Sequence, residues 1–312
     1  MKRLLLQLII LMPLSAAVIY FGYTVVKYTR MISNIFMGLV YKPSPEFIEK
    51  ARGEKVIILD SADREIETLL VERKKSDALV IFCHESGQTK ESWEKYAYFL
   101  PEHGFSVLSV NLSRPEDDEA DKNFLSQWPT TQDVERLLTV IRWSKKALRP
   151  GLKIALFGVS NGADIAFAAS FEEPAVKAMI ADGLFSMKEI FRDYIRKWAP
   201  ILVKPNFFGE KSPEWIIRLF TALGFWYSQK KARKKFIDIE KFLRRKHAPL
   251  LMIHGENDDY IPPLHQKLLE KISRKKSPVL RLVVSRARHN ESVVLARQLY
   301  EKQVIEFLEK YL

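Results

Sequence analysis

Short apolar runs and longer, periodically apolar segments alternate along most of this chain. The alternation begins near Glu54 and continues to Leu312. The short runs have the length and the continuous apolar character of strands that are buried on both faces. The longer segments carry apolar residues every three or four positions, which is the period of a helix with one buried face. The pattern predicts an α/β fold: a mostly parallel twisted sheet with helices on both faces.

The predicted elements are spread evenly along this part of the chain. Residues 56–59 and 66–71 flank the turn signal Ser61-Ala62-Asp63-Arg64, which predicts an antiparallel hairpin. The remaining strands are expected at 78–83, 105–110, 153–157, 178–181, 250–253 and 279–284. The helices are expected at 91–100, 132–147, 162–170, 264–273 and 292–312.

The first thirty residues do not follow this pattern. Residues 4–26 contain no charged residue, and a helix of that length spans about 35 Å, enough to cross a hydrocarbon core of about 30 Å. Ser15-Ala16-Ala17 resembles a signal-peptide cleavage site, but the apolar run continues for nine positions beyond it. We therefore expect a retained single-pass membrane anchor at residues 1–30, with a cleaved signal peptide as the alternative. Basic residues on both sides of the run leave its orientation open.

The rest of the chain is expected to form one domain, residues 54–312, which a connector at 31–53 joins to the anchor. Pro43 and Pro45 stop any helix in the connector. Between residues 185 and 247 the alternation of strands and helices breaks, because this stretch is aromatic, basic and apparently helical. It predicts a helical cap inserted into the sheet domain.

Positive charge is concentrated in this insertion. The chain has a net charge of +12, and residues 188–247 contain sixteen Lys and Arg against six Asp and Glu, which is +10. The aromatic segment 215–227 is followed at once by the basic segment 230–235, which suits a helix on the surface of an anionic membrane. The alternative is a cap whose apolar face packs on its own domain and whose lysines are solvated. No recognition fold accompanies the charge, so a nucleic-acid partner is not expected.

Composition excludes several classes of protein. The chain of 312 residues is 47% hydrophobic and 28% charged, which excludes a disordered or fibrous protein. Cys83 is the single cysteine, so neither an intramolecular disulfide nor a cysteine-based metal site is possible. The histidines are scattered, and no metal or organic cofactor is expected. The acidic run 116–121 is interpreted as a solvated loop.

A candidate nucleophile lies between a predicted strand and a predicted helix. The segment Gly158-Val159-Ser160-Asn161-Gly162 has the pattern GxSxG, in which a serine occupies a tight strand-to-helix turn. The flanking glycines let backbone and helix pass close together. The alternative is a glycine-rich turn in which the serine is incidental.

A serine hydroxyl is a weak nucleophile and needs a base, which in turn needs an orienting acid. Asp258 follows the predicted strand at 250–253, and His289 follows the last predicted strand. Both residues therefore stand at carboxyl ends of strands, at the same edge of the sheet, in the order Ser, Asp, His that this motif requires. Asp258 and Asp259 could instead cap a helix near Pro262.

With these motifs in this order, the chain from about residue 54 to 312 resembles the α/β-hydrolase-fold serine hydrolases. The nearest branch holds monoacylglycerol-lipase-like, prolyl-oligopeptidase-like and membrane-anchored hydrolase-domain proteins. The resemblance implies that Ser160 is the nucleophile, His289 the general base and Asp258 the orienting acid, with Asp259 and Asp182 as alternatives. The matching segments are His84-Glu85-Ser86-Gly87 with Trp93, the Ser160 turn, residues 253–262, and His289-Asn290.

The same resemblance implies an oxyanion hole made of two backbone N–H groups. One belongs to Asn161, the residue after the nucleophile, and the other by position to Ser86. The family usually has His-Gly in the second loop, whereas here Glu85 replaces the glycine. A glutamate side chain there would crowd the site or repel an anionic intermediate. His84 and His254 are interpreted as structural residues.

These features together predict a membrane-anchored serine hydrolase. It would cleave an acyl ester or thioester of lipid character through an acyl-enzyme. An amide or peptide hydrolase of the same fold is the alternative activity. A non-catalytic, membrane-tethered binding protein is the alternative of another class, and Glu85 is the feature that favours it.

Overall fold

The computed structural model describes residues 2–38, 50–74, 76–112, 128–149, 151–204 and 209–312, and of residues 2–10 only the helical backbone. Pro43, Pro45 and the acidic run 116–121 lie outside the described residues. The chain divides into two compact units. The first comprises Met1–Leu39 and Phe191–Arg233, and the second comprises Val40–Ile190 and Lys234–Leu312.

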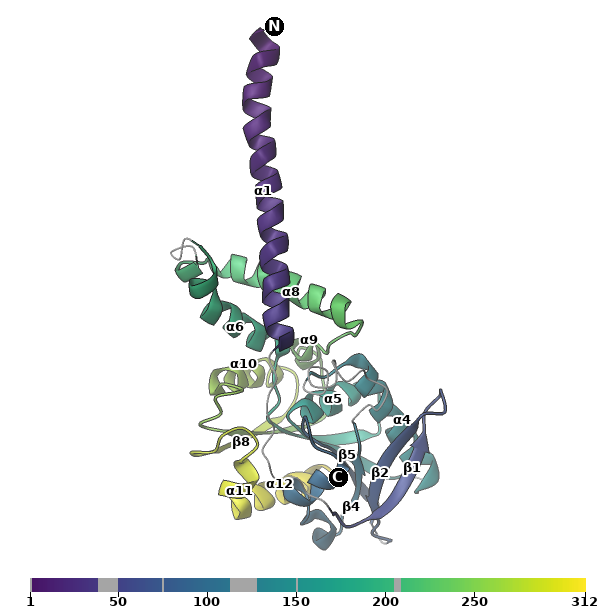
Figure 1. Cartoon of the computed structure of the whole chain (residues 1–312). Helices are drawn as coiled ribbons and strands as arrows, with labels where there is room; N and C mark the ends of the chain where they lie inside the picture. The colour runs from purple at the N-terminus through teal and green to yellow at the C-terminus, as the bar shows by residue number, and fades with distance from the viewer. Residues whose placement is uncertain (1, 39–49, 75, 113–127, 150, 205–208) are drawn as a thin grey trace. The chain divides into compact units, whose positions relative to one another are not determined.

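The second unit is built on one eight-stranded sheet (Figure 1), with the strand order β1-β2-β4-β3-β5-β6-β7-β8. The β1–β2 and β2–β4 pairs are antiparallel, and every later pair is parallel. The predicted hairpin and all six further strands are therefore confirmed. The bounds are β1 Glu54–Leu59, β2 Glu65–Val71, β3 Ala78–Cys83, β4 Ser106–Val110, β5 Lys153–Val159, β6 Val176–Asp182, β7 Leu250–Gly255 and β8 Val279–Val284.

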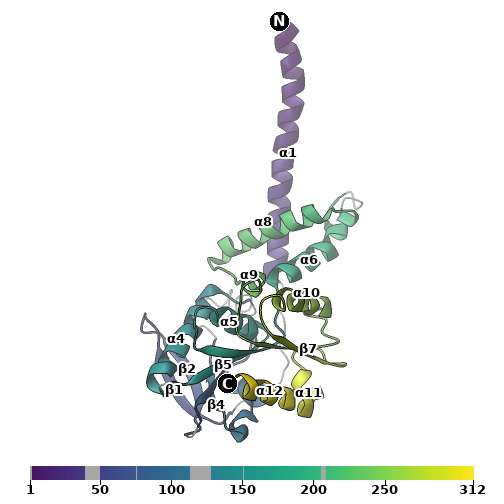
Figure 2. The same cartoon turned by 180° about the vertical axis from the view of Figure 1, so that it is seen from behind.

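Each central strand contributes to two hydrophobic cores, because successive side chains point to opposite faces of a sheet. In β3, Leu79, Ile81 and Cys83 join one core, while Val80 and Phe82 join the other. Helices cover both faces (Figure 2), as the continuous apolar strands predicted. The first core includes α4 (Thr131–Ala147), α5 (Asn161–Ala169), α9 (Ile239–Leu243) and α10 (Pro263–Ser273), and the second includes α2 (Trp93–Tyr96) and α12 (Arg297–Tyr311).

Two predicted helices are interrupted. The segment 91–100 contains a 3₁₀ turn at Lys90–Ser92 and the short helix α2, and a second 3₁₀ turn covers Leu100–His103. The segment 292–312 divides into α11 (Ser292–Leu295) and α12. The breaks fall at Ala97 and Ala296, where φ is −133° in each case and the backbone leaves the helical region. Apolar periodicity continues across both breaks, which is why the pattern alone did not show them.

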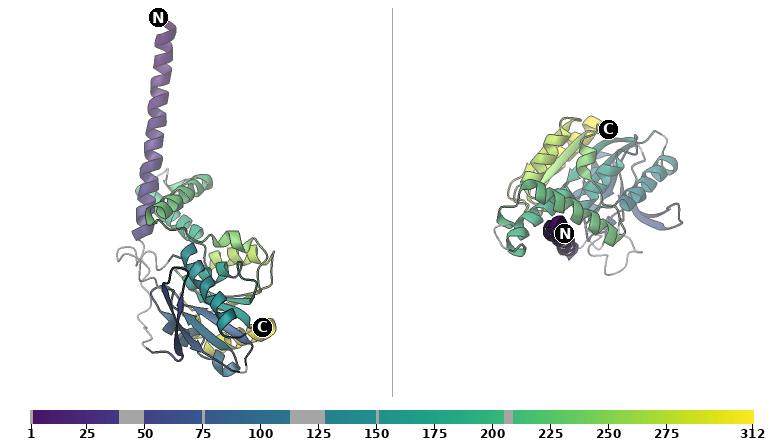
Figure 3. Two further views of the ribbon diagram at one scale, coloured as in Figure 1. Left: turned by 90° about the vertical axis from the view of Figure 1, so that its right-hand side faces the viewer. Right: turned by 90° about the horizontal axis from the view of Figure 1, so that it is seen from above.

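The first unit is helical. Helix α1 runs without interruption from Lys2 to Gly38, so residues 31–38 are helical and the prediction of a connector beginning at residue 31 is wrong there (Figure 3). At 1.5 Å per residue its 37 residues extend for about 55 Å. The helix continues because apolar residues keep recurring at helical spacing up to Phe36. The insertion supplies α6 (Met187–Leu202) and α8 (Glu214–Ala232).

Helices α1 and α8 pack closely together. The buried hydroxyls of Ser33 and Ser228 are hydrogen-bonded at 2.7 Å. A side chain at Gly224 would place its Cβ 2.7 Å from the Phe191 ring and 3.2 Å from Ile32, so any larger residue would have to push the buried ring aside. The buried face of α8 is therefore covered by α1, a partner that the sequence pattern did not predict.

Neighbouring aromatic residues on α8 have opposite environments and give a matched test of which face of this helix is buried. Phe225 is 7% exposed and Trp226 is 57% exposed. Phe225→Ala should reduce the free energy of unfolding by about 3 kcal/mol, because truncating a buried aromatic leaves a cavity. Trp226→Ala should change it by no more than about 0.5 kcal/mol. Thermal unfolding of the full-length protein in detergent measures both, and equal losses would contradict the packing described.

Candidate active site

Ser160 occupies a strained turn between β5 and α5. Its backbone has φ 53° and ψ −120°, a conformation that non-glycine residues rarely adopt. The N–H of Ser160 donates to the carbonyl oxygen of Asp182 at 2.7 Å, which ties the turn to the end of β6. The side chain therefore projects from the tip of a sharp strand-to-helix connection.

The glycines of the motif are required by close backbone contacts. A Cβ at Gly158 would lie 2.3 Å from the carbonyl oxygen of Gly162. A Cβ at Gly162 would lie 2.4 Å from the carbonyl oxygens of Cys83 and of His84. The first turn of α5 is thus packed directly on the backbone that follows β3, and an incidental glycine-rich turn would not need these contacts.

The structure brings Ser160, His289 and Asp258 together in one chain of hydrogen bonds. Ser160 Oγ lies 3.0 Å from His289 Nε2, and His289 Nδ1 lies 2.8 Å from Asp258 Oδ2. The other carboxylate oxygen, Asp258 Oδ1, accepts the backbone N–H groups of Tyr260 at 3.0 Å and Ile261 at 2.7 Å. All three side chains are buried. Asp258 is therefore fixed by the turn that follows it and directs its free oxygen at the imidazole.

The alternative acids occupy other positions. Asp259 is exposed, and Asp182 accepts the hydroxyl of Tyr300 at 2.9 Å. The residue that caps α10 is Pro262, so the interpretation of Asp258 as a helix cap is wrong. Asp258 is the candidate carboxylate that is hydrogen-bonded to His289.

No family model and no curated protein sequence matches the chain. Solved structures do match it. An esterase from Pyrococcus furiosus has a TM-score of 0.60 at 19% identity, covering 88% of this chain and 96% of the esterase. A dienelactone hydrolase from Anabaena variabilis has a TM-score of 0.54 at 19% identity, with 84% and 98% covered. A thermophilic esterase from Thermogutta terrifontis has a TM-score of 0.57 at 14% identity, with 83% and 94% covered.

The chain has the α/β-hydrolase fold. In this fold, ligands bind beyond the carboxyl ends of the strands, and these ends are where the chain places Ser160, Asp258 and His289. The fold assignment predicted from the sequence is confirmed.

In this α/β-hydrolase fold the loop after β3 is held by buried hydrogen bonds. His84 Nδ1–H donates to the carbonyl oxygen of Glu85 at 2.7 Å, and His84 Nε2 accepts the N–H of Leu112 at 2.9 Å. Burial lowers the pKa of His84, which keeps the imidazole neutral and lets it serve both bonds. His84 is thus the loop-orienting residue that the sequence indicated.

Glu85 has its own partners. Its carboxylate accepts the hydroxyl of Ser92 at 3.1 Å and the hydroxyl of Tyr96 at 2.9 Å. Both carboxyl oxygens are therefore bound by hydroxyl donors on the segment after the loop, and the side chain fastens the loop to α2. Ser86 and Asn161, the residues expected to supply the oxyanion donors, are both 7% exposed.

Tyr96, Asp182 and Tyr300 are buried polar residues whose hydrogen-bond partners the sequence did not predict. Burial raises the pKa of Asp182 to about 6, although the Tyr300 hydroxyl and the nearby His289 oppose the shift. The two tyrosines lie on the apolar faces of predicted helices, where an aromatic residue signals only packing. The sequence predicted Asp182 as a carboxylate at the end of a strand, but it did not predict the hydrogen bond to Tyr300.

The remaining histidines and the cysteine have structural surroundings. His254 is buried in β7, and burial lowers its pKa to about 4, so it is neutral at pH 7. Cys83 is fully buried, and burial raises the pKa of its thiol. Within the described residues, no group of three or more His, Cys, Asp or Glu side chains is arranged to hold a metal ion.

The raised pKa of Asp182 predicts a pH-dependent effect of Asp182→Asn. Folded Asp182 keeps its proton up to about pH 6, whereas the unfolded group loses it near pH 3.8, so folding becomes less favourable as pH rises through this interval. Asparagine has no such penalty and can still accept the Tyr300 hydroxyl. The melting temperature of the variant relative to the parent should therefore rise between about pH 4 and pH 6 and then level off. A difference that shrinks over this interval would contradict the assignment.

Proposed function

We propose that this chain is a serine hydrolase that cleaves acyl esters. The observation that carries the proposal is the hydrogen-bonded chain from Ser160 through His289 to Asp258, with the serine at a strained turn. The esterases and hydrolases among the structural matches support the class of reaction. A strained nucleophile is retained in a fold when the surrounding structure holds it there, which the close glycine contacts do.

In the proposed mechanism, His289 is neutral with its proton on Nδ1. The Nδ1–H group donates a hydrogen bond to Asp258, so Nε2 is free to accept the proton of Ser160 as Oγ attacks the acyl carbonyl. The backbone N–H groups of Asn161 and Ser86 would stabilise the resulting oxyanion. His289 then gives its proton to the leaving alcohol or thiol. Water repeats the sequence and releases the acid, so this chemistry needs no metal or organic cofactor.

The substrate proposed is an acyl ester or thioester rather than an amide. The structural matches whose names state an activity on acyl bonds are called esterases, which supports the ester. Glu85 was the feature that favoured a non-catalytic binding protein, and its side chain is held by the hydroxyls of Ser92 and Tyr96. We therefore keep the hydrolase as the single proposal.

Catalysis is tested by three variants of the full-length protein. Ser160→Ala should abolish labelling by a fluorophosphonate and lower ester hydrolysis about a millionfold, because the nucleophile is lost. Asp258→Asn should lower turnover about ten-thousandfold, because the imidazole loses its tautomer restraint. Asp259→Asn is the matched control, one residue away and exposed, and should leave turnover unchanged.

Labelling of the Ser160→Ala protein at the parent level would refute the nucleophile. The assignment of Asp258 as the acid would be refuted if Asp258→Asn had only a mild effect while Asp259→Asn or Asp182→Asn abolished turnover. Circular dichroism of each variant establishes that the fold is retained.

We place the enzyme on a membrane through α1. The segment Leu11–Gly38 of α1 is long and apolar enough to cross a membrane, with a mean hydropathy of 1.2. Its most apolar stretch is not buried against the rest of the protein. A core helix of a soluble protein would be mostly buried, so this exposure supports insertion in lipid over core packing. Beyond the apolar run, Lys27 and Arg30 are followed by the part of α1 that packs on α8.

The surface of α8 supports a second contact with the membrane. Trp215 and Trp226 are 65% and 57% exposed, and the Lys230 ammonium lies 5.5 Å from the centre of the Trp226 ring. Exposed tryptophans beside lysines are typical of a protein surface at a bilayer interface. We propose that this surface contacts anionic lipid close to the point where α1 enters the bilayer.

Anchoring predicts that the protein resists extraction. High-salt and carbonate washes should leave the full-length protein in the membrane pellet, because the apolar part of α1 is held by the hydrocarbon core. The intact mass of the purified protein should include residues 1–30. Release by carbonate would refute the anchor, and a mature N-terminus near Val18 would establish a cleaved signal peptide.

A further inference from the structure

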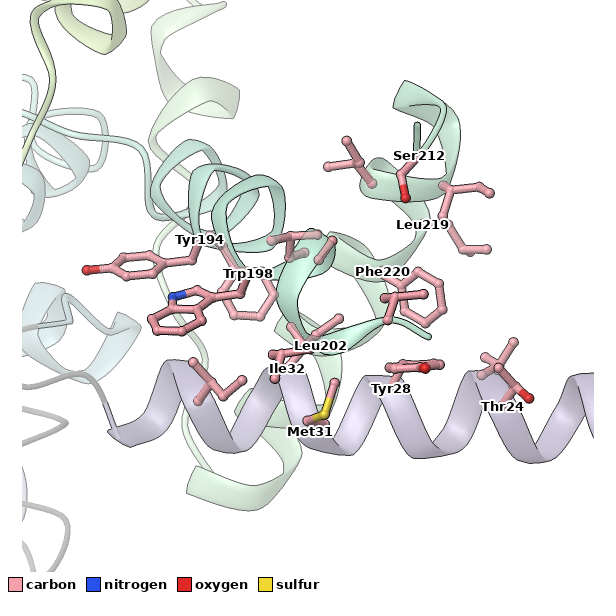
Figure 4. Close-up of a pocket in the computed structure, with 18 of the residues that line it drawn as sticks. Thr24, Tyr28, Met31, Ile32, Tyr194, Trp198, Leu202, Ser212, Leu219 and Phe220 are labelled. Carbon is pink, nitrogen blue, oxygen red and sulfur yellow. The ribbon is translucent and has the colours of Figure 1, made fainter. Parts of the chain in front are cut away.

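An apolar cavity of about 430 Å³ lies within the first unit, between α1, α6 and α8 (Figure 4). In the close-up, Tyr28, Met31 and Ile32 of α1 point towards Phe220 and Leu202 of the opposing helices. Most of the lining is aliphatic or aromatic, and its volume falls within the range of small-molecule sites, about 300–1,000 Å³. None of the residues proposed for catalysis lines it.

The cavity reaches the surface of this unit. Phe21, Trp215 and Leu219 line the cavity, yet they are 66%, 65% and 39% exposed. A side chain that both lines a cavity and is exposed marks the place where the cavity opens. The opening is therefore bordered by apolar and aromatic groups, an arrangement that favours an apolar environment outside it.

The part of α1 that lines the cavity begins inside the uncharged run. The lining extends from Phe21 to Phe36, about 22 Å along the helix axis. Phe21 and Val25 belong to the apolar segment, and Lys27 follows it immediately. If α1 spans the membrane as proposed above, the cavity starts inside the hydrocarbon core, near its edge. One leaflet of that core is about 15 Å thick, so the cavity is long enough for one lipid chain.

The cavity wall also holds one cation. Lys211 lines it and makes no ion pair within the described part of the chain. The nearby Arg196 and Arg218, by contrast, are both paired with Glu214. A solvent-exposed lysine that lines an apolar cavity fits an amphiphile whose head is negatively charged and whose tail is hydrocarbon.

We propose that this cavity binds one acyl chain of an anionic membrane lipid. The inference rests on the proposed membrane anchoring, and it goes beyond the proposed hydrolysis because it assigns the protein a second lipid-binding place. Three observations carry it: an apolar lining, an opening bordered by exposed aromatic groups, and a start inside the membrane-spanning part of α1. A second copy of the chain seated on the same groove is the competing occupant.

The test uses full-length protein in nanodiscs of phosphatidylcholine and palmitic acid that carries a diazirine at the end of its chain. Irradiation should attach the probe to peptides of α1, α6 or α8 that line the cavity, and unlabelled palmitic acid should compete. Ala199→Phe places a ring in the cavity and should reduce this labelling about tenfold. Ala222→Phe is the matched control, since the same substitution falls on an exposed position of α8 outside the lining.

The outcomes separate the possibilities. Equal labelling of the Ala199→Phe and Ala222→Phe proteins, or labelling away from the lining, would overturn the proposal. Light scattering shows whether the protein is a dimer. If it is, and labelling occurs only after the dimer dissociates, a second copy of the chain occupies the cavity instead. Hydrolysis of a short soluble ester and carbonate resistance are measured on the same proteins. Ester hydrolysis reports on catalysis, and carbonate resistance reports on anchoring. A variant that keeps both but loses labelling is therefore altered in the cavity alone.

Discussion

The contact between Gly162 and the carbonyl oxygens of Cys83 and His84 is the constraint on which the candidate site depends. The absence of a side chain at Gly162 lets α5 begin directly against the backbone that leaves β3. This one approach holds together the turn that carries Ser160 and the loop that carries Ser86. Every later feature of the site, from the imidazole to the donor loop, is arranged around two backbone segments that touch.

Three buried carboxyl groups of the second unit have different hydrogen-bond partners. Asp258 receives two backbone N–H groups and an imidazole, Asp182 receives one phenol, and Glu85 receives two hydroxyls. Only the first set leaves an oxygen directed at His289. The chemistry of the site is thus decided by which donors surround each acid, since all three are buried to a similar degree.

The fold and the three central residues could be predicted because their signals are local. Each buried strand is a short apolar run, and Ser160, Asp258 and His289 each come within five residues of the end of such a run. The partners of Glu85 could not be predicted, because Ser92 and Tyr96 come close only after the chain turns back after β3. The extent of α1 was mispredicted for a similar reason: its last turns face α8, nearly two hundred residues later in the sequence. Periodicity shows that a face is apolar, but it does not show what covers that face.

The continuity of α1 couples the cavity to the thickness of the bilayer. No proline lies between Pro13 and Gly38, so the apolar residues 14–26 and the cavity-lining part of α1 belong to one continuous helix. A helix whose apolar length exceeds the local hydrocarbon thickness tilts to compensate, and a straight helix tilts along its whole length. If α1 spans the membrane as proposed, a thinner membrane would therefore also tilt the wall formed by Tyr28 to Phe36. The same protein would then offer its lipid a differently shaped cavity in membranes of different thickness.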